Sequence, residues 1–175
     1  DLEESRRLLA EAGFPNGLKL SMLINQRDPD TLVAQVLQQQ LAEVGIEVEI
    51  DAPDRSGLSA ILAADQWDVF QGRVNVPRAD PDHMYGLTYG RTATSQNFAR
   101  IKDDELFDEV DAGRMAVVQS ERKAHYLRVQ NILHDKSYYA FMFFREVRHV
   151  ARKELKNLTV DVGGAWDLAQ VWLEA

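Results

Sequence analysis

The sequence predicts an α/β fold in which helices flank a mostly parallel or mixed sheet. Apolar residues recur at helical and then at strand spacing along the first 70 residues, and glycine follows two of the predicted helices. Hydrophobic residues make up 45% of the 175 positions, which is enough for a buried core. The order strand, helix, strand, helix, strand is typical of parallel βαβ units.

The first half of the chain accounts for most of this pattern. Gly13 and Gly45 can adopt the left-handed conformation that ends a helix, and Pro15 blocks the first helix from resuming. The predicted elements are a helix over residues 2–12, a strand over 18–24, a helix from an Asp30 N-cap to residue 44, a strictly alternating strand over 46–50, a short helix from Ser56 and a strand over 67–70.

The second half is predicted to be mainly helical and then to return to strands. A short helix is expected to start at Asp80 or Asp82, followed by helices from Asp103 to about residue 118 and from a Ser120 cap through residue 133. Residues 138–144 and 147–151 read as strands, and the aromatic run in the first of them is expected to pack in the core. We expect residues 1–175 to form a single lobe, and the helix-like pattern at its first residues predicts a fragment of a larger protein.

Composition excludes several classes of function. The formal net charge of -8 disfavours binding to nucleic acid. The chain has no cysteine, and its four histidines lack helical i, i+3 or i, i+4 spacing, so no metal site is predicted. Neither phosphate-binding glycine pattern occurs, and no cofactor is expected. No apolar run reaches the length of a membrane-spanning helix, and no signal peptide is visible.

The stretch from Asp68 to Asp82 is the strongest candidate for a binding segment. A short apolar strand runs into a polar loop, and loops at strand ends are where α/β folds bind ligands. Within it, Arg73 can hold a carboxylate or a phosphate in a bidentate manner. The residues expected to contact a ligand are Arg73, Val74, Asn75, Pro77, Arg78, Asp80 and His83.

Asp80 and Asp82 allow two interpretations. As paired carboxylates next to His83 they suggest a small hydrolase, whereas aspartates in this position also cap helices. The capping interpretation is favoured for Asp82, and both stay open for Asp80. Because the chain carries no catalytic signature, we predict a binding protein and not an enzyme.

Several segments, in order, resemble the C-terminal lobe of family 5 extracellular solute-binding proteins, the oligopeptide-, dipeptide- and nickel-type receptors of ABC importers. They are residues 7–17 (RLLAEAGFPNG), 38–48 (QQQLAEVGIEV), the Asp68 to Asp80-Pro81 loop, Asn97 with residues 103–108 (DDELFD), and 121–133 (ERKAHYLRVQNIL). The resemblance implies a lobe of the type II periplasmic binding-protein fold in a two-lobed receptor.

That resemblance also implies partners and a location. They are a small or peptide-like solute, a missing N-terminal lobe of the same protein, an ABC permease, and the periplasm. In peptide-binding members an aspartate three residues before the Asp-Pro pair anchors the peptide's amino group, and here that position is Pro77. The aromatic residue often found three positions earlier is Val74. Both departures argue against ordinary peptide binding. A ligand-sensing domain of a regulator and the hydrolase remain as alternatives.

Overall fold

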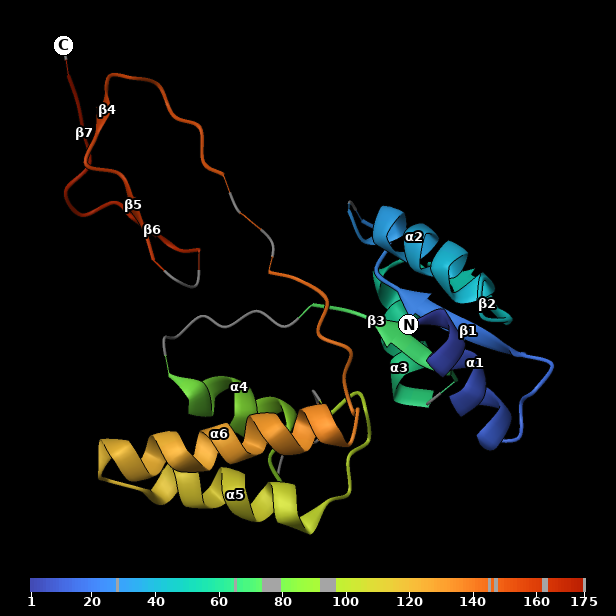
Figure 1. Cartoon of the computed structure of the whole chain (residues 1–175). Coiled ribbons are helices and arrows are strands. Elements are labelled where there is room, and N and C mark those ends of the chain that lie inside the picture. Colours follow the sequence, from blue (N-terminus) through green and yellow to red (C-terminus); the bar gives the residue numbers. More distant parts are fainter. Residues whose placement is uncertain are drawn as a thin grey trace. The chain divides into compact units, whose positions relative to one another are not determined.

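A computed structural model describes residues 1–27, 29–64, 66–73, 80–91, 97–144, 146, 148–161 and 164–174. The chain divides into two compact units, Asp1–Arg73 and Val74–Ala175. The first is an α/β unit, and the second contains helices followed by short strands (Figure 1). That both units belong to a single lobe stays a prediction.

The first unit confirms the predicted alternation of helices and strands. Its elements are α1 (Leu2–Glu11), β1 (Leu18–Ile24), α2 (Asp30–Ala42), β2 (Ile46–Asp51), α3 (Arg55–Ala64) and β3 (Val69–Gln71). The three strands form a parallel sheet in the order β2-β1-β3. Two predicted caps were wrong: Asp30 is the first residue of α2 and Pro29 is its cap, and α3 begins one residue before Ser56.

Two glycines bring the starts of β1 and β2 side by side. Gly17 and Gly45 have φ angles of +83° and +88°, a region that side chains disfavour. A Cβ atom on Gly17 would lie 1.9 Å from the Gly45 carbonyl oxygen. That same oxygen accepts a hydrogen bond from the amide of Leu18 at 3.2 Å, so the close approach starts the pairing of the two strands.

Apolar side chains from β1, β2 and α2 form the core of the first unit. Met22, Ile24 and Val48 are buried against Ala34, with Leu37 and Leu41 of α2 packed around them. Right-handed crossovers in opposite directions place α2 on one face of the sheet and α3 on the other (Figure 1). The apolar stripe predicted for α2 is only partly buried, because Leu32 and Val36 are exposed.

Three helices form the core of the second unit. They are α4 (Pro81–Thr88), α5 (Asp104–Met115) and α6 (Gln119–Asp135). The buried side chains of this core come from the helices and from the segment between α4 and α5, and they are Tyr89, Ile101, Leu106, Val110, Tyr126, Val129 and Leu133. Asp80, one of the two residues predicted to start α4, is its cap, whereas Asp82, for which capping was favoured, lies in the first turn. Asp103, predicted to start α5, is its cap. Helix α6 begins at Gln119, and Ser120 is not its cap. No helix among the described residues is long and apolar enough to cross a membrane.

The strands predicted at residues 138–144 and 147–151 were wrong. The described residues of both ranges are in no strand, because no neighbouring strand pairs with their backbone groups. The core packing expected for the aromatic run holds only for Tyr138 and Tyr139, while Phe141, Phe143 and Phe144 are exposed. The strands of this unit lie later, at β4 (Leu155–Lys156), β5 (Thr159–Val160), β6 (Trp166–Asp167) and β7 (Trp172–Leu173).

Candidate functional site

The carboxyl ends of β1 and β3 form the edge of the sheet where an α/β fold binds ligands. After β1 the chain crosses to β2 on one side, and after β2 it returns to β3 on the other. Ligands of open α/β sheets bind outside the carboxyl ends of the strands, so the residues that follow β1 and β3 are the candidates for this site. The two ends are level, because Ile24 pairs with Gln71 in the sheet register. Arg27 and Arg73 follow these two strand ends.

A buried carboxylate holds both of these arginines. Asp30 is 2% exposed, and its Oδ1 accepts from Nε of Arg73 at 2.7 Å and contacts Nη2 at 2.6 Å. Its Oδ2 accepts from Nε of Arg27 at 3.1 Å. As the first residue of α2, Asp30 also lies at the positive end of the helix dipole, which favours its negative charge. Arg73, predicted to hold a ligand anion, is thus paired with a carboxylate of its own chain.

The side chain of Gln71 adds an unsatisfied acceptor at the same strand end. Gln71 is 6% exposed, and its Oε1 has no hydrogen-bond partner among the described residues. Side chains two residues apart on a strand share a face, and Val69 packs against the core beneath α2. Gln71 therefore faces the α2 side, the side of Asp30. A buried carbonyl oxygen without a partner is costly unless water or a ligand donates to it.

Four of the predicted ligand residues, Val74, Asn75, Pro77 and Arg78, lie outside the described residues. Their predicted roles stay predictions. The remaining two, Asp80 and His83, lie at the start of α4 in the second unit. The backbone amide of His83 donates to the Asp80 carbonyl oxygen at 3.1 Å, which closes the first turn of the helix.

The Asp80 carboxylate has structural partners. Its Oδ1 accepts from the Asp82 amide at 2.8 Å, and its two oxygens accept from Nη2 and Nη1 of Arg122 at 2.7 and 3.0 Å. The Arg122 hydrogen bonds, with the Asp82 amide, hold the pKa of Asp80 below its ordinary value. Arg122 also donates to the Gly113 carbonyl oxygen and lies over the Tyr126 ring. Sequence reasoning did not single out Arg122 as a partner of Asp80.

Asp82 is bonded in the same way, to a different arginine. Its Oδ1 accepts from Nε of Arg114 at 2.9 Å and from the Tyr126 hydroxyl at 3.4 Å. Gly86 makes room for this contact, because a Cβ there would lie 2.1 Å from Nη2 of Arg114. Both carboxylates are therefore bonded to an arginine of the same unit, Asp80 to Arg122 and Asp82 to Arg114, and Asp80 also caps α4. The geometry therefore gives no support to the hydrolase.

No group of three or more potential metal-binding side chains occurs within the part of the chain that the structure describes. The chemistry at the strand ends is that of hydrogen bonding and charge. It consists of two arginines, one buried carboxylate and one unpartnered amide oxygen. This arrangement can orient a polar group.

Comparison with known proteins identifies the family. Residues 1–96 match the model of bacterial extracellular solute-binding proteins, family 5 Middle. The chain is 24% identical over 180 residues to di/tripeptide-binding protein 2 of Pseudomonas aeruginosa, a match that covers 99% of this chain and 34% of that protein. The chain thus spans about a third of the length of the curated relatives it matches.

Solved structures similar to this chain support the same family assignment. The periplasmic binding protein DppA of Helicobacter pylori, in complex with the peptide STSA, is 28% identical with a TM-score of 0.73, over 79% of this chain and 28% of that one. A dipeptide-binding protein of Pseudoalteromonas sp. SM9913, in complex with Met-Leu, is 18% identical with a TM-score of 0.79, over 99% of this chain and 36% of that one. The predicted α/β class and its likeness to type II periplasmic binding proteins are confirmed. This chain belongs to the family 5 bacterial extracellular solute-binding proteins.

Proposed function

We propose that this chain is a solute-binding lobe of a periplasmic receptor that delivers a small solute to an ABC importer. The observation that carries the proposal is the arrangement at the carboxyl ends of β1 and β3. There Arg73 is held on the buried Asp30, and the unpartnered Oε1 of Gln71 lies at the end of the same strand. A donor of fixed direction next to a buried acceptor suits recognition of a polar group and not its conversion, so the protein binds and does not catalyse.

The mechanism is closure of two lobes around the solute. The second lobe is the part of the receptor that this chain lacks. Contacts made only in the closed form shift the population toward it, and the permease recognises that form. The segment from Gly72 to Asp82 supplies contacts from this lobe, with Arg73 at its start. Location in the periplasm follows from the same role.

The solute is a short peptide or a small molecule with peptide-like polarity. Relatives named for di- and tripeptides support this class. Pro77 stands where peptide-binding members place the acid for the amino group, so this receptor anchors that group elsewhere or takes a solute without one. Arg73 meets the carboxylate end of the solute, since a guanidinium forms its strongest bonds with carboxylates and phosphates.

The test uses the intact receptor. Mass spectrometry of the solute that co-purifies identifies its class, and calorimetry with that solute and a panel of di- and tripeptides measures affinity. Replacement Arg73→Ala should weaken binding about 10- to 100-fold, the range expected for loss of a charge-assisted hydrogen bond. Arg91→Ala is the matched control, because Arg91 pairs with Asp104 and Asp108 of α5 in the second unit.

The control should bind like the unchanged receptor. An Arg73→Ala receptor that stays folded and keeps full affinity would remove Arg73 from the site. A purified receptor that retains no solute and binds no member of the panel would remove the proposed solute class.

A further inference from the structure

Gln71 places a carboxamide at the end of an apolar face of the sheet. Met22, Ile24 and Val69 belong to the apolar cluster between the sheet and α2. Gln71 pairs with Ile24 in the sheet register and follows Val69 by two residues, so its side chain lies on the same face. It is the last residue of β3 and is buried. A polar group thus ends a row of apolar side chains at the carboxyl edge of the sheet.

The acceptor of this carboxamide is unused. Oε1 of Gln71 has no hydrogen-bond partner among the described residues. A buried acceptor without a donor lowers stability, and a solute that donates to it would account for its presence. Gln38 of α2 differs, because its Nε2 donates to the Val48 carbonyl oxygen at 2.7 Å and so has a structural role.

The surroundings of Gln71 favour an uncharged donor. A buried ammonium needs a carboxylate of its own, since burying an unpaired charge is costly. The described carboxylate at these strand ends, that of Asp30, already bonds to Arg27 and Arg73. An amide N–H needs only the neutral acceptor that Gln71 offers.

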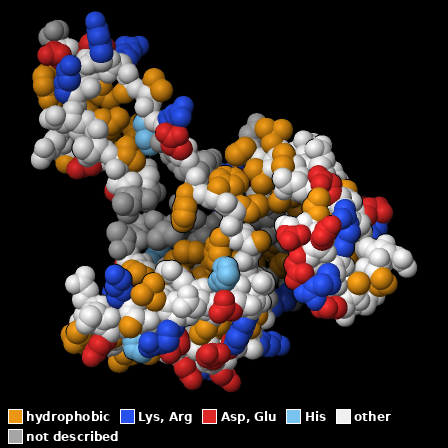
Figure 2. All heavy atoms as spheres, viewed as in Figure 1, with side chains coloured by type: hydrophobic (Ala, Val, Ile, Leu, Met, Phe, Trp, Pro, Cys, Tyr) orange, Lys and Arg blue, Asp and Glu red, His pale blue; other side chains and the backbone are white. Residues whose placement is uncertain are grey.

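Charge on the surface of the first unit does not choose between these donors. Figure 2 shows acidic and basic side chains interspersed on this unit. Lys19, for example, contacts Glu47 and Glu49 at 3.4 and 3.3 Å. Fields of one sign steer charged ligands, whereas charges of mixed sign largely cancel. Selection must therefore come from direct contacts.

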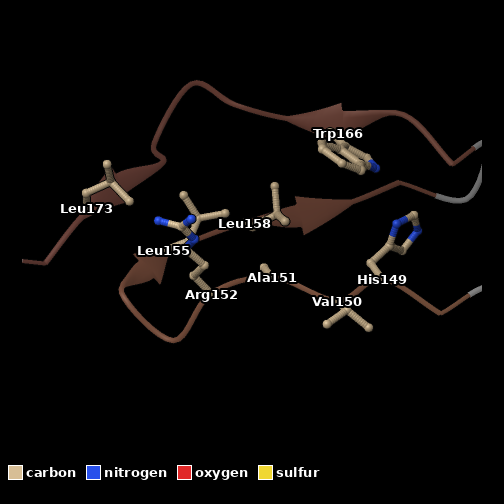
Figure 3. A pocket seen from close by; sticks show the side chains of 8 residues that line it. All are labelled: His149, Val150, Ala151, Arg152, Leu155, Leu158, Trp166 and Leu173. Carbon is tan, nitrogen blue, oxygen red and sulfur yellow. The ribbon is translucent and has the colours of Figure 1, made fainter.

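A hollow in the second unit has a different chemistry. Apolar side chains dominate its lining, among them Leu155, Leu158 and Trp166 (Figure 3). Its volume is about 190 Å³, below the range of about 300–1,000 Å³ usual for small-molecule pockets. Within the described part of the chain, none of its lining side chains has a buried polar atom without a hydrogen-bond partner. The unused acceptor lies at Gln71 and not in this hollow.

We propose that Gln71 determines specificity by accepting a hydrogen bond from an uncharged N–H of a solute that also carries a carboxylate. The inference rests on the proposed function, in which Arg73 meets that carboxylate. Gln71 and Arg73 are two positions apart, so their Cα atoms are at most about 7 Å apart. The first nitrogen and the carboxylate of a dipeptide have the same upper limit. The favoured class is therefore short peptides whose amino end is acylated.

Three probes that differ at one atom test this in the intact receptor by calorimetry. At the first residue, acetyl-alanyl-alanine has an amide N–H, O-acetyl-lactyl-alanine has an ester oxygen and alanyl-alanine has an ammonium. The unchanged receptor should bind the amide about 10-fold or more tightly than the ester, and more tightly than the ammonium. Gln71→Met removes the acceptor at similar volume and should bind amide and ester within about 3-fold of each other.

Thermal melts of the solute-free receptor add a readout that needs no ligand. Gln71→Met should keep or raise the melting temperature, because it removes an unpaired buried acceptor. Gln38→Met is the matched control. It should lower the melting temperature by about 1–2 °C, through loss of the bond to Val48, and leave all three affinities unchanged.

Several results would overturn the role of Gln71. They are an equal preference for the amide over the ester in both receptors, tighter binding of alanyl-alanine than of its acetylated form, and a drop in melting temperature for Gln71→Met as large as that for Gln38→Met. A receptor that binds its co-purified solute but none of the three probes also loses this inference, while the proposed function stands. Binding of the acetylated probe that depends on Gln71, with no binding of the panel of free peptides, would instead remove only free peptides from the proposed solute class.

Discussion

Replacement of Arg73 by alanine measures how much the Arg73–Asp30 contact, which joins the end of β3 to the start of α2, stabilises the first unit. It removes two contacts with Oδ1 of Asp30, at 2.7 and 2.6 Å, and leaves a carboxylate that is 3% exposed. Removing one partner of a fully buried pair costs about 3–5 kcal/mol. Arg73 is 27% exposed and Arg27 still reaches the carboxylate, so we expect a loss of about 2–3 kcal/mol in the free energy of unfolding.

Arg27→Ala is the matched control, since it removes an arginine from the same carboxylate. That side chain is 54% exposed and makes one contact at 3.1 Å, so its loss should cost about 0.5 kcal/mol. Urea unfolding followed by far-ultraviolet circular dichroism measures both variants and the unchanged chain. Equal losses for the two replacements, or less than about 0.5 kcal/mol for Arg73→Ala, would refute the argument that burial makes the Arg73 contact the stronger one.

Three further replacements probe contacts within one unit each. Arg122→Ala should lower the free energy of unfolding of the helical unit by about 1–2 kcal/mol, because the bidentate contact with Asp80 is lost. In the same urea unfolding experiment, Arg122→Lys should recover less than half of that loss. Burial raises the pKa of Asp103, but the ammonium and hydroxyl groups bonded to it lower that pKa more, to below its ordinary value. The stabilisation from Asp103 is therefore present above the unfolded-state pKa and lost in acid, and the difference between the unchanged chain and Asp103→Asn should shrink from about pH 6 to about pH 3. Gly17→Ala should lower the free energy of unfolding, measured by a thermal melt, by about 2 kcal/mol or more. Gly13→Ala should lower it clearly less, because the φ angle there is also positive but no atom lies within 4 Å of the added Cβ.

Local sequence signals predicted the alternation of helices and strands in the first unit and several helix ends in both units, because local chemistry sets these features. Gly13 and Gly45 stand at the positive φ angles that end α1 and α2, and Asp80 and Asp103 cap the helices that follow them. Each of these features depends on residues within four positions, so a single sequence contains the information.

The aromatic run after α6 shows where such reasoning fails. Its spacing fits a buried strand, but a strand also needs a neighbour to accept its hydrogen bonds. The Tyr139 hydroxyl accepts from the Ala99 amide at 3.4 Å, and its ring meets that of Tyr89, so this end of the run joins the helical core. Phe143 and Phe144, a few residues later, are exposed.

The sequence indicated residues of the candidate site by their type, but it did not indicate the residues they bond to. Sequence reasoning selected Arg73 and Asp80, but not their partners, which lie 43 and 42 residues away along the chain. Asp30 was interpreted only as a helix cap, since a buried ion pair leaves no local pattern. The parallel pairing of β1 with β3 brings Arg73, which follows β3, to the start of α2.

That pairing changes what Arg73 contributes to the proposed receptor. A guanidinium bonded to a buried carboxylate has much of its charge compensated, so it attracts anions less than the sequence alone implied. Arg27 and Arg73 both bond to the carboxylate of Asp30. The side chain is also fixed before the solute arrives, which lowers the entropy lost on binding. In the proposed receptor Arg73 would therefore act more by orientation than by attraction, which favours discrimination between similar polar solutes.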